Sequence, residues 1–287
     1  MKANAIIRII LFSIAIVVLL SILGVGIAAK HYMFDNDFSG EYTASSTGTA
    51  DADTVRNISI EWAAGTITMR PADVTELTFT ETCPEGTDPM VWIQSGDTLK
   101  VAYVSQDSIF HFGFSSHTTP SKDLLIEVPR GWSCGILDVQ IAAADLNVDS
   151  MTIGKVDFDG ASGSFNFVDC AVEAIDMDTA SGDVKFCGTL NSLECDAASA
   201  DCEIVLSNCP ERIDMDMASG DLDLTLPEGC GFDARMDALS GRMDTDFEIS
   251  KTSNGFVCGD GSCRIDISAM SGDLYIHKST EAKKCDH

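Results

Sequence analysis

Residues 213–226 read IDMDMASGDLDLTL and carry the pattern that decides the fold. Apolar and polar residues alternate strictly before the central Ser-Gly-Asp and alternate again after it. Since successive side chains of a β-strand point to opposite faces, this period of two predicts two half-buried strands joined by a bend at Gly220. The aliphatic and methionine side chains are expected to face a core, and the aspartates to face water.

The same pattern recurs along the second half of the chain. The third positions of the successive turns are Asp145, Ser164, Asp183, Asp201, Asp221, Arg242 and Asp273, at intervals of 19, 19, 18, 20, 21 and 31 residues. A period near twenty is typical of a solenoid or another repeat array. The long last interval indicates an insertion around residues 250–262. The central glycines are expected to supply backbone angles that other residues resist; these structural turns are at Gly163, Gly182, Gly220, Gly241 and Gly272.

Two all-β architectures fit this alternation. In a single-stranded β-solenoid, each unit is one coil, and like positions stack along the axis. In an antiparallel β-sandwich, each Ser-Gly turn closes a hairpin, and Asp216 would lie opposite Asp223 in an unfavourable like-charge pair. The solenoid is our main prediction, with the sandwich as the alternative.

Stacking would bring the aspartates of successive units into columns. Carboxylates about 4.8 Å apart repel each other by roughly 0.9 kcal/mol even at the dielectric of water. Strand twist or bound cations would relieve this repulsion, which makes calcium a candidate ligand, although the Asp-rich loops of known calcium motifs are missing from the sequence. The candidate metal ligands are Asp157, Asp159, Asp176, Asp178, Asp214 and Asp216.

The first thirty residues predict a membrane anchor. Residues 9–29 carry no charged side chain, and at about 1.5 Å per residue they span roughly 30 Å, the thickness of a bilayer core. Lys2 and Arg8 precede this segment, which predicts a single-pass protein of the cell membrane with a cytoplasmic N-terminus and an extracytoplasmic C-terminal domain. The alternative is a cleaved signal peptide with a small-x-small site at residues 26–28.

The chain then divides into further parts. After the anchor with its short cytoplasmic N-terminus (1–30), a linker of mainly small and polar residues (31–54) is expected to be flexible. Residues 55–277 form the predicted β-repeat domain, and residues 278–287 form a tail. Within the domain, Ser95-Gly96-Asp97 predicts a hairpin. The aromatic stretch at 109–114 predicts either a packed strand or an exposed contact tip.

Charge and cysteine content limit the partners and the covalent structure. The net charge of −27 repels nucleic-acid phosphates and anionic lipid head groups, so no nucleic-acid partner is expected. The chain has 11 cysteines, and an extracytoplasmic location permits disulfides. Cys258 and Cys263 bracket a Gly-Asp-Gly turn and are the most plausible local pair.

Catalytic chemistry has little support in the sequence. None of the histidines, His31, His111, His117, His277 and His287, lies in a zinc-type or triad-type setting. The paired carboxylates recur in every unit, which favours an architectural role. We therefore expect no catalytic residues and no cofactor beyond the calcium considered above.

The series of Ser-Gly-Asp turns, with the strands closed by Pro-x-Gly at residues 123–131 and 221–229, resembles the bacterial toastrack or "putative adhesin" family of domains of unknown function. The resemblance covers roughly residues 55–277. It implies a right-handed, single-stranded β-helix-like fold on membrane-anchored proteins of the cell envelope, and it brings no catalytic residues. The chain departs from the family in its cysteine content and its acidic strands.

These observations together predict a non-enzymatic, membrane-anchored protein of the cell surface. Its function would be that of a binding or adhesion scaffold or of an envelope-associated sensor accessory, with an envelope protein or a glycan as partner. The alternatives are a glycan-active β-helix enzyme and an acidic cation-binding surface protein.

Overall fold

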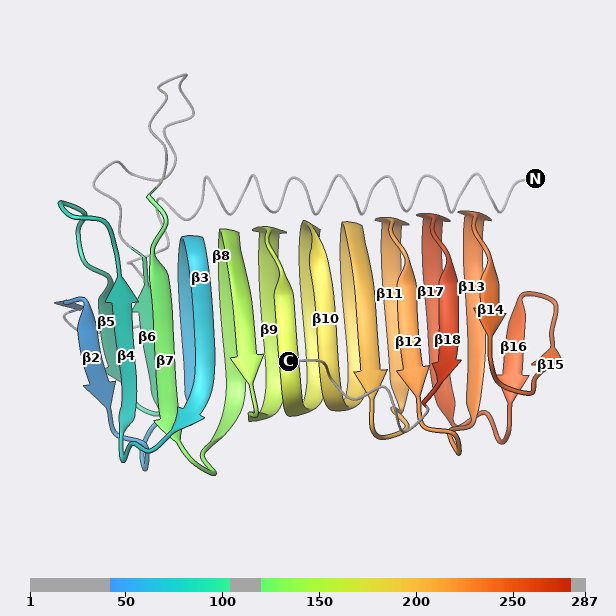
Figure 1. The fold of residues 1–287 in the computed structure, drawn as a ribbon, viewed down its shortest axis with the longest axis horizontal. Coiled ribbons are helices and arrows are strands. Elements are labelled where there is room, and N and C mark those ends of the chain that lie inside the picture. The colour runs from blue at the N-terminus through green and yellow to red at the C-terminus, as the bar shows by residue number, and fades with distance from the viewer. Residues whose placement is uncertain (1–41, 104–119, 280–287) are drawn as a thin grey trace, which may run out of the picture.

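The computed structural model describes residues 42–103 and 120–279, and within these ranges the chain is all-β (Figure 1). The predicted anchor, the aromatic stretch at 109–114 and the end of the predicted tail lie outside them. No helix in the described ranges is long and apolar enough to cross a membrane. The first nine strands are β1 (Thr43–Ala44), β2 (Thr47–Ala50), β3 (Asn57–Ala72), β4 (Leu77–Thr82), β5 (Val91–Ser95), β6 (Thr98–Ala102), β7 (Asp123–Pro129), β8 (Ser133–Asp149) and β9 (Thr152–Ser162). The others are β10 (Phe165–Leu206), β11 (Arg212–Ser219), β12 (Leu222–Leu226), β13 (Phe232–Ser240), β14 (Met243–Thr245), β15 (Ser250–Lys251), β16 (Gly255–Cys258), β17 (Cys263–Ser271) and β18 (Leu274–Lys278).

The repeating units stack in parallel register. Val139 of β8 pairs with Phe158 of β9, which in turn pairs with Met177 of β10. Further along, Cys195 of β10 pairs with Met215 of β11. Each unit of about twenty residues is therefore one coil that lies on the next, as the solenoid prediction requires. The parallel pairing excludes the antiparallel sandwich.

The order of the last coils in space differs from their order in the chain (Figure 1). The final coil, residues 263–278, is formed by β17 and β18 and is called the C-terminal coil below. On one side it pairs with β11 and β12, and on the other with β13 and β14. It thus lies between two coils that are consecutive in sequence. The predicted insertion at 250–262 forms the hairpin of β15 and β16, and β16 covers β13 in antiparallel register.

The inward-facing residues of each coil form one continuous core. In the coil quoted first, Ile213, Met215, Leu222 and Leu224 are at most 1% exposed, so the alternation correctly identified the buried face. Full burial of such a side chain contributes about 1.5–3 kcal/mol. Phenylalanines of neighbouring positions stack within the core, with the ring centroids of Phe165 and Phe167 4.1 Å apart.

Glycine is required at the Ser-Gly corners because the coils approach one another closely there. A Cβ at Gly182, whose φ is 149°, would lie 1.8 Å from the carbonyl oxygen of Gly163. Gly163, Gly220, Gly241 and Gly272 have positive φ as well, and a Cβ at each would lie within 1.9 Å of a carbonyl oxygen of the neighbouring coil. A side chain at these corners would push the coils apart.

Ordered strands begin earlier than the sequence indicated. β1 and β2 fall inside the stretch expected to be a flexible linker, yet they pair in antiparallel register with β5 and β4. Gly48 lies against the ring of Phe79, and only Ala50 of β2 is fully buried, so no apolar periodicity marked this segment. These short strands cover the edge of the first coils. The hairpin at Ser95-Gly96-Asp97 is confirmed, because β5 and β6 pair from Ser95 and Thr98 outward.

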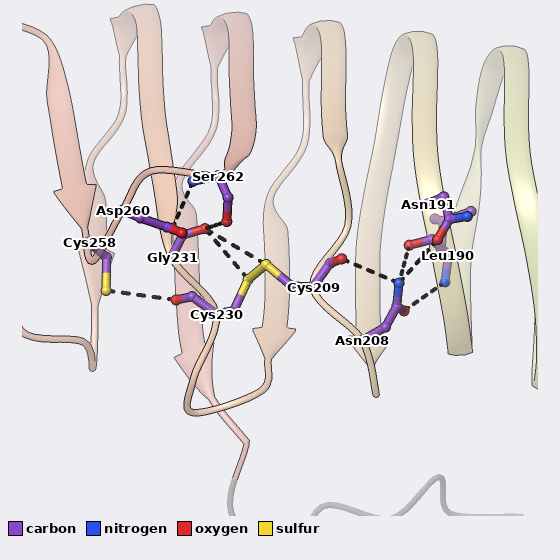
Figure 2. The surroundings of a disulfide bond; sticks show 9 residues. All are labelled: Leu190, Asn191, Asn208, Cys209, Cys230, Gly231, Cys258, Asp260 and Ser262. Carbon is purple, nitrogen blue, oxygen red and sulfur yellow. Dashed lines mark hydrogen bonds between the residues drawn. A yellow bond between two sulfur atoms is a disulfide. The ribbon is translucent and has the colours of Figure 1, made fainter.

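The predicted disulfide between Cys258 and Cys263 is wrong, and the topology explains why. Both residues are free thiols, and both pair with Phe232, one from β16 and the other from β17. They therefore lie on opposite sides of β13, about 9.6 Å apart at the usual strand spacing, which is beyond the reach of a disulfide. A disulfide links Cys209 to Cys230, with their Cα atoms 5.3 Å apart (Figure 2).

Candidate functional site: an acidic face on the stacked coils

The strands that precede the Ser-Gly corners display two columns of carboxylates. Register pairs connect the members of each column from coil to coil, and the electrostatic effect of Asp178 and Asp196 on each other's surroundings links the two halves of the columns within β10. The first acidic column contains Asp138, Asp157, Asp176, Glu194, Asp214 and Asp266. The second acidic column contains Asp159, Asp178, Asp196 and Asp216. Because residues two apart on a strand share a face, the two columns run side by side over one outer surface.

Basic side chains from the adjacent column compensate part of this charge. Lys155 forms ion pairs with Asp157 on its own strand and with Asp176 on the next coil, the latter at 3.3 Å. Arg212 pairs with Asp214, and Arg264 pairs with Asp266. The repulsion expected within the first acidic column is thus relieved by the protein's own cations at these coils. Each of these exposed ion pairs contributes little to stability, because solvent screens the two charges.

The repulsion between carboxylates is less compensated in the second acidic column than in the first. Partial burial, together with the neighbouring Asp178, raises the pKa of Asp159 to about 6. Partial burial and the flanking Asp216 and Asp178 likewise raise the pKa of Asp196 to about 6. The pKa of Asp178 is raised for the same reasons, burial first and then nearby carboxylates. The centre of this face is therefore a region of strong negative potential near neutral pH.

The structure brings the candidate metal ligands together in pairs along these columns. Asp157 lies beside Asp176, and Asp159 lies beside Asp178, whereas Asp214 and Asp216 belong to a coil farther along the stack. In the described part of the chain, no group of three or more His, Cys, Asp or Glu side chains is arranged to hold a metal ion.

His277 is the one histidine that falls within the described ranges, and it sits between two coils. Its Nδ1 lies 3.2 Å from Oδ2 of Asp246, and its Nε2 lies 3.4 Å from Oδ1 of Asp223. The imidazole ring stacks on Tyr275, with 6.1 Å between the ring centroids. Each ring nitrogen therefore faces a carboxylate on a different side. His277 connects β12, through Asp223, with the end of β14, through Asp246.

Sequence reasoning missed a buried ion pair near the first coils. Nζ of Lys122 lies 3.1 Å from Oε1 of Glu81, and both side chains are fully buried. Glu81 accepts the N–H of Met90 at 2.9 Å, and the ammonium group lies 4.3 Å from the ring centroid of Tyr103. No periodic signal marks such a pair, since Lys122 precedes its strand and Glu81 occupies an inward position among threonines. Its burial fixes the packing of β4 against the segment that leads into β7.

The fold and the acidic face define an all-β protein of stacked parallel coils whose outer surface carries columns of carboxylates. The chain belongs to the family described as Toastrack DUF4097, which matches residues 55–277. This match confirms the resemblance noted in the sequence.

The chain is also similar to several solved structures, at low sequence identity. A putative adhesin from Bacteroides fragilis is 12% identical, covers 84% of this chain and 98% of its own, and has a TM-score of 0.45. A putative cell adhesion protein from Clostridium sporogenes is 9% identical, with 83% and 100% covered and a TM-score of 0.39. A putative lipid binding protein from Parabacteroides distasonis is 11% identical, with 84% and 98% covered and a TM-score of 0.29. No curated protein matches the chain.

Proposed function

We propose that this protein is a non-enzymatic binding scaffold of the cell surface, held in the membrane by its N-terminal segment with the coil domain outside. The observation that carries the proposal is the stack itself. Exposed side chains recur at a constant spacing along parallel coils, and repeat proteins of this kind offer extended surfaces to extended partners. We also propose that the coils wind in the right-handed sense that the family resemblance implies.

The charge of the exposed columns favours one kind of partner. The carboxylates with raised pKa, Asp159 and Asp196, mark a surface that would be stabilised by an approaching positive charge. Charged surfaces also steer oppositely charged partners toward them and disfavour partners of like charge. An envelope protein or glycan with cationic groups fits this face, and a nucleic acid does not.

The test places a photo-crosslinking amino acid on the full-length chain in its native envelope. Two variants carry it on the acidic face, at Asp178 and at Asp216, and the control carries it at Glu203, an exposed carboxylate that follows the Ser-Ala-Asp turn at 199–201. We expect a shared crosslinked partner from Asp178 and Asp216 that is missing from the Glu203 control. Identical crosslinks from all three positions would contradict a binding role for this face.

Two further measurements separate the proposal from its alternatives. External protease should degrade the coil domain in intact cells while the N-terminal segment stays with the membrane; protection of the domain would contradict the proposed topology. The purified chain should leave cell-envelope glycans intact, and release of glycan fragments would replace the scaffold by a glycan-active enzyme.

A further inference from the structure

We propose that the C-terminal segment, residues 280–287, is a strap that returns across the outer surface of the strands that follow the corners, and that a disulfide between Cys285 and Cys187 fastens it to β10. This strap goes beyond the scaffold function proposed above. Three observations carry it: the bonded state of Cys187, the burial of an outward-facing residue on β12, and the position at which the chain leaves β18.

The cysteines of the chain leave one partner for Cys187. The sequence holds 11 cysteines, and Cys187 is disulfide-bonded. Cys209 and Cys230 are joined to each other. The other described cysteines are free thiols, namely Cys83, Cys134, Cys170, Cys195, Cys202, Cys258 and Cys263. Cys285, which lies outside the described ranges, is therefore the partner that the chain itself can offer.

An outward-facing residue of β12 is buried, which indicates that a further segment covers it. Thr225 lies between Leu224 and Leu226, whose side chains are in the core, so its own side chain points outward. Thr225 is nevertheless only 1% exposed. Asp223, two residues earlier on the same face and also flanked by strands on both sides, is exposed. The cover is thus local to the position of Thr225.

Thr225 belongs to an outward column that leads from β18 to Cys187. The N–H of Ser207 donates to the carbonyl oxygen of Gly188, a parallel pairing that sets residue 205 beside residue 187. The register pairs of β10 with β12 and of β12 with β18 continue the column. Its members, in spatial order, are Cys187, Val205, Thr225 and His277. Cys187 is therefore three coils away from β18.

The chain after β18 is placed and long enough to follow this column. The N–H of Ser279 donates to the carbonyl oxygen of Leu226 at 2.8 Å, so the segment starts beside Thr225. Three coils at about 4.8 Å each amount to roughly 14 Å. The six residues from Ser279 to Cys285 reach about 20 Å when extended. A segment that joins Cys285 to Cys187 thus passes over the covered residue.

The bond forms by exchange with a disulfide donor. A thiolate of one cysteine attacks the donor and releases one donor thiolate; the second cysteine then attacks the mixed disulfide and releases the other, and the two donor thiolates take up the two protons. Cys187 is partly exposed and suited to this exchange. Burial raises the pKa values of the thiols that face the core, so they compete poorly; these are Cys134, Cys170, Cys195, Cys202 and Cys263.

The test uses the full-length chain in detergent, reduced and then reoxidised with oxidised glutathione, so that its result does not depend on the proposed location in the cell. Remaining thiols are blocked with N-ethylmaleimide, and the chain is digested without reduction. We expect mass spectrometry to find a peptide that links Cys187 to Cys285. In Cys285→Ala, Cys187 should carry N-ethylmaleimide instead. Cys83→Ala, which removes a free thiol, is the control and should leave the linked peptide unchanged.

A zero-length crosslink between amines and carboxylates then tests the course of the strap. Lys283 and Lys284 directly precede Cys285, and Glu203 is exposed on the same face as Val205, one coil from Cys187. We expect either lysine to be joined to Glu203 in the bonded chain. The yield should fall at least about tenfold in Cys285→Ala, because the disulfide sets the effective concentration of the lysines at this surface. Glu173, an exposed carboxylate on a strand that precedes a corner, should give no crosslink to them.

N-ethylmaleimide on Cys187 of the reoxidised wild type, or a link from Cys187 to another cysteine, would overturn the proposed disulfide. A 187–285 disulfide without a crosslink to Glu203 would overturn the course over Val205 and Thr225. An equal crosslink yield in Cys285→Ala would show that the disulfide does not hold the segment in place, and would overturn the strap as proposed.

Discussion

The backbone N–H of Asp273 donates a hydrogen bond of 2.7 Å to Oδ1 of Asp221, although 52 residues separate the two in the chain. The same bond joins Asp221 to Asp201 at 3.0 Å and Arg242 to Asp273 at 2.8 Å. The third positions of these four turns therefore form a ladder, in which a carboxylate accepts the amide of the next coil. The ladder runs in the spatial order 201, 221, 273, 242, and so records the insertion of the C-terminal coil.

Removing one step of this ladder is expected to loosen two coils. Asp221→Ala should lower the free energy of unfolding by about 1 kcal/mol, because the amide of Asp273 loses a charged acceptor. Asp221→Asn keeps an oxygen acceptor in place and should stay close to wild type. Urea unfolding of the three proteins measures the difference, and equal losses for both variants would contradict a hydrogen-bonding role.

The corner glycines should tolerate no side chain. Gly182→Ala would place a methyl group 1.8 Å from the carbonyl oxygen of Gly163, so the coils must separate locally. We expect a loss of at least about 3 kcal/mol, to which both the clash and the positive φ contribute. Gly229→Ala, where nothing lies within 4 Å, is the control and should be nearly neutral. Thermal unfolding compares the two.

The sequence predicted the features that recur in each coil, and it missed the features that occur only once in the chain. Alternation identified the buried face of every coil, and the corner glycines marked the bends, because both follow from backbone geometry. The order of the last coils was beyond such reasoning, since the alternation in β13 and β17 is equally compatible with β11. The Cys258–Cys263 prediction failed for this reason: it assumed that neighbours in the chain are neighbours in space. The pair of Lys122 and Glu81 gave no signal, because a single buried contact has no period.

Stability should fall as pH rises from about 5 to about 7. The pKa values of Asp159 and Asp196 are raised to about 6 in the folded chain, against 3.8 as the ordinary value. Within this window the folded state holds protons that the unfolded state has lost, so folding is favoured below the folded pKa, and the advantage disappears above it. The pKa values of Asp51 and Asp273 are lowered, and stability linked to them is lost only at more acidic pH.

The double variant Asp159→Asn with Asp196→Asn tests this dependence. It should flatten the melting temperature between about pH 5 and pH 7 and raise it at neutral pH, since the repulsion in the second acidic column is removed. Glu203→Gln, outside both columns, is the matched control. A wild-type melting temperature that rises over this range would contradict the assigned direction.

The disulfide between Cys209 and Cys230 should contribute measurably to stability. It joins residues 21 apart in the chain, and closing a loop of this length restricts the unfolded state by about 3 kcal/mol. Cys209→Ala with Cys230→Ala is expected to lose about that amount in urea unfolding. Peptide mapping without reduction should recover the 209–230 link, and recovery of a 258–263 link in its place would contradict the arrangement of β13, β16 and β17.

Removing one partner of the buried pair of Lys122 and Glu81 should destabilise the fold more than removing both charges. Lys122→Met leaves a carboxylate uncompensated in the core and is expected to cost about 3–5 kcal/mol. Adding Glu81→Gln removes that charge while preserving an acceptor for the N–H of Met90. The double variant should therefore recover most of the loss, because two charges no longer have to be taken out of water. A double-mutant cycle in urea measures the coupling. Additive losses would mean that the two side chains act independently, in conflict with their contact of 3.1 Å.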